Sequence, residues 1–136
     1  MTVFVDTSGF YAVLDRDEAR HPLASEIWAS LLGGAALMVT TNYIVLETLA
    51  LLQRRLGMVA VRVFVEEVLP AMHIEWVSIE DQEASLAALL TANRRHLSLV
   101  DCTSFQVLRR LGLRSVLAFD HHFEEQGFEP VVSPSV

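Results

Sequence analysis

The stretch Val3-Phe4-Val5-Asp6-Thr7-Ser8 joins a short apolar run to an aspartate and two hydroxyl residues. Three large apolar residues in a row, two of them β-branched, predict a strand buried on both faces, as in a parallel sheet. Val116-Leu117-Ala118-Phe119-Asp120 likewise closes an apolar run with an aspartate. Because ligands bind beyond the carboxyl ends of parallel strands, we expect Asp6 and Asp120 to occupy equivalent places.

Short apolar runs alternate with helical periodicity along the rest of the chain. The predicted strands are Val3–Val5, Ala36–Thr40, His73–Val77, Ser115–Phe119 and Phe128–Val132. The predicted helices are Phe10–Leu14, Leu23–Leu32, a helix capped by Asn42 that runs to about Leu56, Met58–Leu69, Ile79–Ala92 and Ser98–Leu111. This alternation predicts one α/β domain over residues 1–136 with a mainly parallel sheet of four to five strands, and residues 133–136 are expected to fray.

Composition and charge limit the classes of protein to which the chain can belong. Its 136 residues are 52% hydrophobic, which excludes disorder and allows a substantial core. The net charge of -7 argues against non-specific attraction to nucleic acid but permits a local basic patch. All ten cations are arginine, which excludes sites that depend on a lysine, such as a P-loop or a Schiff base.

Three observations favour a soluble, cytoplasmic protein. Cys102 is the single cysteine, so no internal disulfide can form. The first residues lack the basic region and long apolar core of a signal peptide. Gly33-Gly34 and Glu47 interrupt the weakly charged stretch from Ile27 to Gln53, which leaves no apolar run of roughly 20 residues for a membrane span.

Four carboxylates occupy positions where a solvated acid is not expected. They are Asp6, Glu47, Asp101 and Asp120. Burying a carboxylate is costly unless it is paired, hydrogen-bonded or bound to a metal. If the fold brings the four together, repulsion and desolvation leave some of them protonated unless a cation is present. A divalent metal site is therefore the first hypothesis.

Each of these acids also has an ordinary structural explanation. Asp6 can cap a helix, Ser98-x-x-Asp101 matches a capping box, and Asp120 can be a turn residue. Glu47 can lie on an exposed stripe of its helix, although it has few polar neighbours. The helical neighbours of Asp101 are small or apolar, which indicates that its side chain points toward the sheet.

Four segments of the chain resemble the motifs of the PIN domain family, most closely its VapC-like ribonuclease toxins. They are Val5-Asp6-Thr7-Ser8, the helix with Asn42 and Glu47, Leu97 to Phe105, and Phe119-Asp120-His121-His122-Phe123 followed by Gly127-Phe128. The resemblance covers the whole chain. Arg94-Arg95-His96 departs from the family pattern, because members often carry acidic or lysine residues at this place, and the difference bears on substrate contacts.

The resemblance implies a three-layer α/β/α sandwich in which the four acids gather at one end of the sheet and hold Mg²⁺ or Mn²⁺. Asp6 and Asp101 would be the principal ligands, and Glu47 and Asp120 would complete the cluster directly or through water. Supporting hydrogen bonds are implied for Thr7, Ser8 and Ser104. Family members commonly form homodimers, and an antitoxin segment occupies a groove near the site.

The expected activity is Mg²⁺- or Mn²⁺-dependent hydrolysis of RNA phosphodiester bonds, by one or two ions and without a side-chain nucleophile. The expected catalytic residues are Asp6, Glu47, Asp101 and Asp120. Candidates for phosphate contact are Arg54-Arg55, Arg94-Arg95 and Arg109-Arg110, which equally fit surface residues at helix ends. The alternative function is a catalytically silent PIN-like module that binds RNA or protein.

Other patterns favour structure over chemistry. His121-His122 lacks a further Cys/His cluster, so it does not predict a transition-metal site. Cys102 is expected to be a small buried residue, and Trp28 and Trp76 are expected in the core. An aspartyl phosphotransfer domain is disfavoured because no lysine is present and no second aspartate lies two residues after Asp6. The chain is too short for the DNA-clamping elements of a flap-type nuclease.

Overall fold

The structure, a computed structural model, describes residues 1–133, in which five strands form one parallel sheet. The strands are β1 (Thr2–Val5), β2 (Leu37–Thr41), β3 (His73–Glu75), β4 (Ser115–Leu117) and β5 (Glu129–Pro130). Their order is β3-β2-β1-β4-β5, and every neighbouring pair is parallel. The chain therefore builds outward from β1 on one side and then returns to its other side, which makes the β1–β4 junction a topological switch point.

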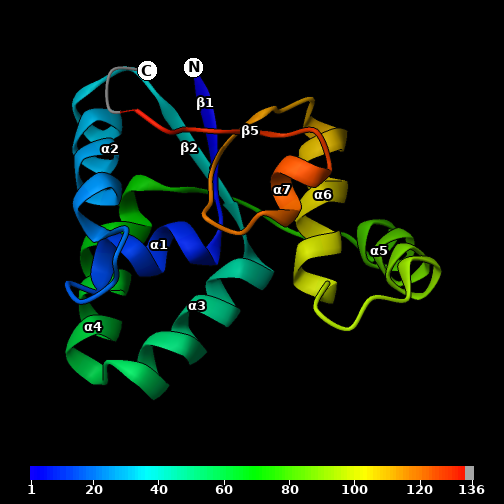
Figure 1. Cartoon of the computed structure of the whole chain (residues 1–136), viewed down its shortest axis with the longest axis horizontal. Helices are drawn as coiled ribbons and strands as arrows, with labels where there is room; N and C mark the ends of the chain where they lie inside the picture. Colours follow the sequence, from blue (N-terminus) through cyan, green and yellow to red (C-terminus); the bar gives the residue numbers. More distant parts are fainter. Residues whose placement is uncertain (134–136) are drawn as a thin grey trace.

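Helices cover both sides of this sheet. They are α1 (Thr7–Leu14), α2 (His21–Gly33), α3 (Asn42–Arg55), α4 (Met58–Val63), α5 (Ile79–Ala92), α6 (Leu99–Leu111) and α7 (His122–Glu125), with a π-helical turn η1 (Phe64–Val68) and a 3₁₀ turn η2 (Leu69–Ala71) after α4. Figure 1 shows α1 to α4 on one side of the strands and α5 to α7 on the other. The predicted three-layer α/β/α sandwich with a parallel sheet is confirmed.

The core lies on both faces of the central strand. Val3, Phe4 and Val5 of β1 are fully buried, as their uninterrupted apolar run predicts. On one side, the ring of Phe10 packs edge-on against the ring of Phe64 with centroids 5.1 Å apart. On the other, Phe105 contacts both Phe123 and Phe128. Aromatic pairs in these geometries add to the free energy gained by burial. They also hold the helices in place against the sheet.

Helix α1 lies unusually close to strand β4. A Cβ atom added at Gly9 would be 2.4 Å from the backbone oxygen of Leu117, which is well inside van der Waals contact. Only glycine permits this approach. The start of α1, and with it Asp6, is thereby held against the end of β4.

Two strands end earlier than predicted because backbone N–H groups just beyond them donate to side chains instead of to a neighbouring strand. The predicted strand over Ser115–Phe119 stops at Leu117, and the N–H of Phe119 donates to Ser8 Oγ at 2.9 Å. The predicted strand over His73–Val77 stops at Glu75, and the N–H of Val77 donates to Asn42 Oδ1 at 2.8 Å. The strand predicted over Phe128–Val132 is also shorter than expected and comprises Glu129–Pro130.

The bond from Val77 N–H to Asn42 also explains why Asn42, the predicted cap of α3, does not cap this helix. The side chain of Asn42 is engaged with the segment after β3, and Thr41 caps the helix instead by accepting from the N–H of Ile44 at 3.1 Å. The helix predicted over Met58–Leu69 is α-helical only as far as Val63, where α4 ends. The π-helical turn η1 and the 3₁₀ turn η2 follow it. Pro70 lies within the 3₁₀ turn, where its missing N–H costs little.

The core prediction is wrong for Trp76, whose surface is 70% exposed after the end of β3. Trp28 is half-buried and makes an edge contact with Phe10. Cys102 is buried with a free thiol, as predicted. The short helix α7 was not predicted, since its polar sequence has the composition of a turn.

No helix within residues 1–133 combines the length and apolar content required to cross a lipid bilayer. The expectation that the chain end frays concerns mainly residues 134–136, which lie outside the described part of the structure.

Candidate active site

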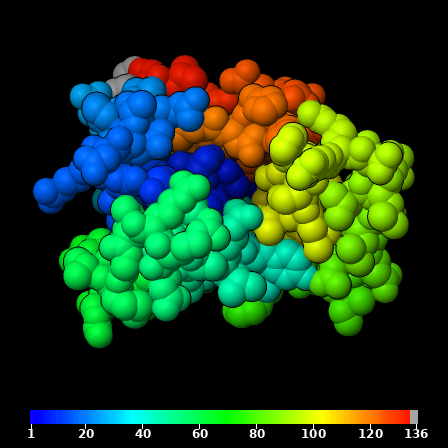
Figure 2. Space-filling view, turned by 60° about the horizontal axis from the view of Figure 1, so that its bottom comes forward, coloured from blue at the N-terminus to red at the C-terminus, as the bar shows by residue number. Residues whose placement is uncertain are grey.

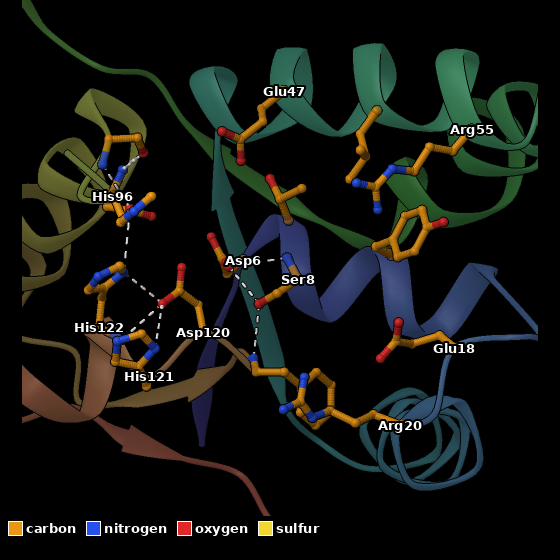
Figure 3. Close-up of a pocket in the computed structure, with 16 residues that line it drawn as sticks. Asp6, Ser8, Glu18, Arg20, Glu47, Arg55, His96, Asp120, His121 and His122 are labelled. Carbon is orange, nitrogen blue, oxygen red and sulfur yellow. Dashed lines mark hydrogen bonds and ion pairs between the residues drawn. The ribbon is translucent and has the colours of Figure 1, made fainter.

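The four acids singled out in the sequence line one cavity of about 550 Å³ at the carboxyl ends of β1 and β4. Figure 2 shows this end of the molecule, where the first residues of the chain lie recessed between α3 and the segments that follow residue 95. The close-up in Figure 3 shows Asp6, Glu47 and Asp120 converging on the cavity from different elements. Asp101, from α6, completes the lining.

Asp6 is held at the end of β1 by the residue two positions further on. Its Oδ2 atom accepts hydrogen bonds from the backbone N–H of Ser8 at 3.1 Å and from the Ser8 hydroxyl at 2.7 Å. The same hydroxyl accepts from the N–H of Phe119, immediately before Asp120. Ser8 therefore ties the end of β1 to the segment after β4, and the predicted supporting role of this residue has a structural basis.

Glu47 reaches the cavity from one turn inside α3. The Thr7 hydroxyl donates to its carboxylate and accepts from the hydroxyl of Thr48 at 3.1 Å. Thr7 and Thr48 are buried, whereas Glu47 is half-buried and turned toward Asp6 in Figure 3. A chain of two threonines thus orients the one acid that comes from α3.

Asp101 occupies the third position of α6 and forms a capping box with Ser98. Its Oδ2 atom accepts from the N–H of Ser98 at 3.0 Å, and its own N–H donates to Ser98 Oγ at 3.0 Å. The carboxyl group is nevertheless almost fully buried, because the first turn of α6 faces the end of the sheet. Ser104, which the resemblance implies as a supporting residue, donates instead to the backbone oxygen of Val100.

Asp120 adopts the turn conformation that its surroundings in the sequence predict. Its Oδ1 atom accepts from the N–H of His122 at 2.9 Å. The ordinary explanations of Asp6, Asp101 and Asp120 as cap, capping-box and turn residues are therefore all confirmed. They coexist with a position in the cavity, because a capping bond uses only one oxygen of a carboxylate.

The second oxygen of each aspartate remains available. Hydrogen bonds from the described residues go to Oδ2 of Asp6, Oδ2 of Asp101 and Oδ1 of Asp120, and none goes to the other oxygen. Local backbone bonds fix the orientation of the three carboxyl groups. The remaining oxygens are hard anionic donors, and each bonded oxygen keeps a second lone pair.

The clustering of these acids changes their protonation. Burial, with smaller contributions from Asp101 and Glu47, raises the pKa of Asp6 to about 7. Burial likewise raises the pKa of Glu47 and of Asp101, and repulsion from Asp120 acts in the same direction on both. A divalent cation would relieve this cost, so the donor set fits a hard ion such as Mg²⁺ or Mn²⁺.

His122 lies within this cluster and was not predicted there. Its side chain is buried, and its Nδ1 atom lies 2.8 Å from Asp120 Oδ1 and 3.8 Å from Asp101 Oδ2. The side chain of its neighbour His121 is 74% exposed. The spacing Asp120-x-His122 is the feature of the sequence that could have predicted this position. A turn bond from the His122 N–H to Asp120 brings the two side chains to the same side.

Arginines border the cavity at two points. Arg55 lies over the ring of Tyr11 at 5.6 Å, and Arg20 lies over the ring of Phe119 at 5.4 Å. Figure 3 shows both on the side of the cavity away from His122. Arg55 belongs to a pair named in the sequence analysis, but Arg20 was missed because it stands alone in a charged loop.

The other arginine pairs are engaged elsewhere on the molecule. Arg94 pairs with Glu125 at 2.9 Å, Arg109 donates to Gln126, and Arg110 bridges Glu75 and Asp81. None of these three lines the cavity.

The chain is similar to known proteins in both sequence and structure. The family model described as PIN domain matches residues 3–129. The chain is 35% identical over 130 residues to the 23S rRNA-specific endonuclease VapC20 of Mycobacterium tuberculosis, in strains CDC 1551 / Oshkosh and ATCC 25618 / H37Rv, with 95% of this chain and 97% of that protein covered. A crystal structure of M. tuberculosis VapC20, described as a sarcin-ricin loop cleaving toxin, superposes with a TM-score of 0.85 at 34% identity and covers 95% of this chain and 98% of that one.

Proposed function

Because this chain belongs to the PIN domain family, we propose that it is a metal-dependent endoribonuclease of the VapC toxin type. The observation that carries the proposal is the cavity in which Asp6, Glu47, Asp101 and Asp120 converge with raised pKa values on three of them. Perturbed carboxyl groups that share a cavity without a compensating buried arginine or lysine are typical of a cation site.

Asp6 and Asp101 would hold the ion most directly, because both are fixed by capping bonds and are almost fully buried. Glu47 and Asp120 would complete its surroundings, directly or through water. When bound, Mg²⁺ or Mn²⁺ supplies Lewis-acid chemistry: it lowers the pKa of a water molecule and offsets the charge of the phosphate. The four acids themselves bind and orient, and no side chain acts as a nucleophile.

RNA must approach a strongly acidic site on a protein with a net charge of -7. Arg20 and Arg55 would supply the local attraction, since both guanidinium groups are positioned on aromatic rings at the border of the cavity. The substrate proposed is a structured ribosomal RNA loop, because the relative VapC20 is named for cleavage of 23S rRNA at the sarcin-ricin loop. A cognate antitoxin, a homodimer and action in the cytoplasm are proposed on the same family basis.

Cleavage of a synthetic RNA hairpin tests this proposal. The purified chain should cut a hairpin with the sarcin-ricin loop sequence in the presence of Mg²⁺ or Mn²⁺, leave 5′-phosphate and 3′-hydroxyl ends, and be inactive in a chelator. Asp101→Asn and Asp6→Asn should each lower the rate by at least about 100-fold, because each removes a ligand charge. Asp17→Asn is the matched control, since Asp17 is exposed outside the cavity.

Two results would reject the proposal. Full activity of Asp101→Asn would remove the assigned role of this residue. Absence of cleavage together with the absence of any metal-dependent shift in melting temperature would favour the alternative of a catalytically silent binding module.

A further inference from the structure

We propose that His122 Nδ1 is a ligand of the divalent ion, so that Asp101, Asp120 and His122 form a mixed nitrogen and oxygen site that favours Mn²⁺ over Mg²⁺. The inference rests on the proposed function, because it assumes that the acid cluster binds a metal. It adds a ligand that the four-acid site does not include, and it assigns a preference between the two ions.

The first argument is the state of the His122 ring. The residue is only 5% exposed, and within residues 1–133 its Nδ1 atom is the one buried side-chain nitrogen or oxygen without a hydrogen-bond partner. Asp120 Oδ1 lies 2.8 Å away, at ion-pair distance, but the alignment of the two groups does not make a hydrogen bond. A buried polar atom without a hydrogen bond is unfavourable, because it has lost its bonds to water. A cation next to Nδ1 would remove that cost.

The second argument is the spacing of the donor atoms. One ligand atom from each of Asp101, Asp120 and His122 lies within 4.8 Å of the other two. The Nδ1 atom lies 2.8 Å from Asp120 Oδ1 and 3.8 Å from Asp101 Oδ2, and each of these oxygens has a second lone pair beside the backbone bond that it accepts. Adjacent ligands of an octahedral ion with bonds of about 2.1 Å lie about 3 Å apart, and opposite ones about 4 Å. The two distances from Nδ1 therefore fit ligands of one ion.

The backbone keeps the ring in this place. The His122 N–H donates to Asp120 Oδ1, which fixes the relative position of the two residues at the start of α7. The ring of His121, whose side chain is mostly exposed, packs against that of His122 with centroids 4.4 Å apart. The position of Nδ1 thus follows from the turn and from packing, as expected of a preorganised ligand.

The donor chemistry decides which ion is preferred. Mg²⁺ prefers an all-oxygen environment and loses its water reluctantly. Imidazole nitrogen is a softer donor and favours the transition-metal end of the series, to which Mn²⁺ belongs. Two carboxylates and one imidazole therefore bind Mn²⁺ more strongly than Mg²⁺, whereas the same site without the imidazole would discriminate less.

Paramagnetic resonance of bound Mn²⁺ tests this assignment directly and without an activity assay. Electron spin-echo modulation of the wild-type protein with Mn²⁺ should show coupling to a directly bound ¹⁴N nucleus. Growth with ¹⁵N-labelled histidine should convert this signal to that of ¹⁵N. The coupling should disappear in His122→Gln and persist in His121→Gln, the matched control on the adjacent exposed residue.

Competition between the two ions gives the second measurement. His122→Gln should weaken Mn²⁺ binding by about 10-fold or more and change Mg²⁺ binding much less, so that the ratio of the two affinities falls. If His122→Gln does not fold, the double variant His96→Gln/His121→Gln keeps the test decisive, because it removes the other two histidines that line the cavity. Nitrogen coupling retained in that variant supports the assignment to His122, and its loss overturns it.

The outcomes separate this inference from the proposed function. Mn²⁺ that binds the wild type, is lost in Asp101→Asn and shows no nitrogen coupling would overturn the role of His122 and leave the nuclease proposal intact. Absence of any Mn²⁺ or Mg²⁺ binding would overturn both.

Discussion

At the scale of single residues, the aspartates of the cavity combine two roles that are often regarded as alternatives. Asp6 accepts both bonds from Ser8 with one oxygen, and Asp101 accepts from the N–H of Ser98 with one oxygen. The capping bond fixes each carboxyl group before any ligand arrives. Preorganisation of this kind reduces the entropy lost on binding, so structural and functional explanations of the same acid reinforce each other.

The raised pKa of Asp6 predicts how the metal-free protein responds to pH. A folded-state pKa of about 7 against 3.8 in the unfolded chain means that the folded state holds the proton more tightly. The resulting stability is complete below about pH 4 and is lost as the pH rises through 7. Between pH 5 and pH 8 the free energy of unfolding should fall by about 2–3 kcal/mol from this group, as measured by chemical denaturation in a chelator.

Asp6→Asn is the control for this prediction. Asparagine is an equally good helix cap and is close in shape to aspartate, so the variant should fold and lose most of the slope between pH 5 and pH 8. Mg²⁺ or Mn²⁺ should reduce the slope of the wild type in the same way. An unchanged slope in Asp6→Asn would show that other groups cause the pH dependence.

Ser8→Ala tests the connection between the two halves of the site. The hydroxyl donates to Asp6 and accepts from the N–H of Phe119. Its loss leaves that N–H without a partner and leaves Asp6 with the bond from the backbone N–H of residue 8 alone. The free energy of unfolding should fall by about 1–3 kcal/mol, and cleavage should slow by roughly 10- to 100-fold. Ser98→Ala, which disturbs one element alone, should keep the Asp6 environment, read as an unchanged pH dependence of stability.

The sequence predicted the residues of the cavity better where chemistry was unusual than where it was ordinary. An acid after an apolar strand or inside an apolar helix is conspicuous, so Asp6, Glu47 and Asp120 were found. Arg20 and His122 were not, because an arginine in a charged loop and a histidine in a polar turn are common. Their place at the cavity depends on side-chain contacts that only the folded structure reveals.

At the scale of secondary structure elements, the close packing of α1 against β4 determines the position of Asp6. Gly9→Ala would place a methyl group 2.4 Å from the backbone oxygen of Leu117, which is not a flexible neighbour. The variant should lose about 2–3 kcal/mol of unfolding free energy and most of its activity, because α1 must move with Asp6. Gly33→Ala, at the end of α2 with open space around it, should be neutral or slightly more stable. Equal stability of the two variants would contradict the close packing.

The junction of α5 and α6 depends on a partly buried ion pair. Arg110 donates to both oxygens of Asp81, at 3.0 and 2.9 Å, and to Glu75 at the end of β3. Asp81 is 2% exposed and belongs to the capping box of α5, so removing its partner leaves a buried charge. Arg110→Ala should destabilise the protein by about 2–3 kcal/mol in thermal or denaturant unfolding.

Arg114→Ala is the matched control for that ion pair. Arg114 pairs with Glu129, but the two side chains are 72% and 65% exposed. Water screens such a pair, and its loss should change stability by less than about 0.5 kcal/mol. A loss as large as that of Arg110→Ala would show that burial does not set the difference.

The order and type of the elements were predictable from apolar periodicity, but their ends were not. β3 and β4 stop where Asn42 and Ser8, far away in the sequence, accept the next backbone N–H. Trp76 follows the last paired residue of β3, which is an edge strand, and no helix within residues 1–133 buries its ring. Local sequence carries no record of such long-range partners.

At the scale of the whole molecule, the negative net charge predicts a weak salt dependence of RNA binding. Among the arginines of residues 1–133, only Arg20 and Arg55 border the cavity, so few counterions are released when RNA binds. In the Asp101→Asn background, the slope of log affinity against log salt should be about -2, and Arg55→Gln should reduce it by about 1. Arg114→Gln, whose residue precedes β4 at the opposite end of that strand, should leave it unchanged. A steep slope would indicate a basic surface elsewhere.

The strand order also has a consequence for synthesis on the ribosome. β1, β2 and β3 occupy the first 75 residues and are neighbours in the sheet, so this half can begin to assemble as it emerges. β4 must then insert on the free edge of β1, which brings Asp120 to the end of the sheet near Asp6 only after residues 115–120 have been made. We therefore expect a nascent chain to lack nuclease activity until β4 has joined the sheet, because the acid cluster is incomplete before that step.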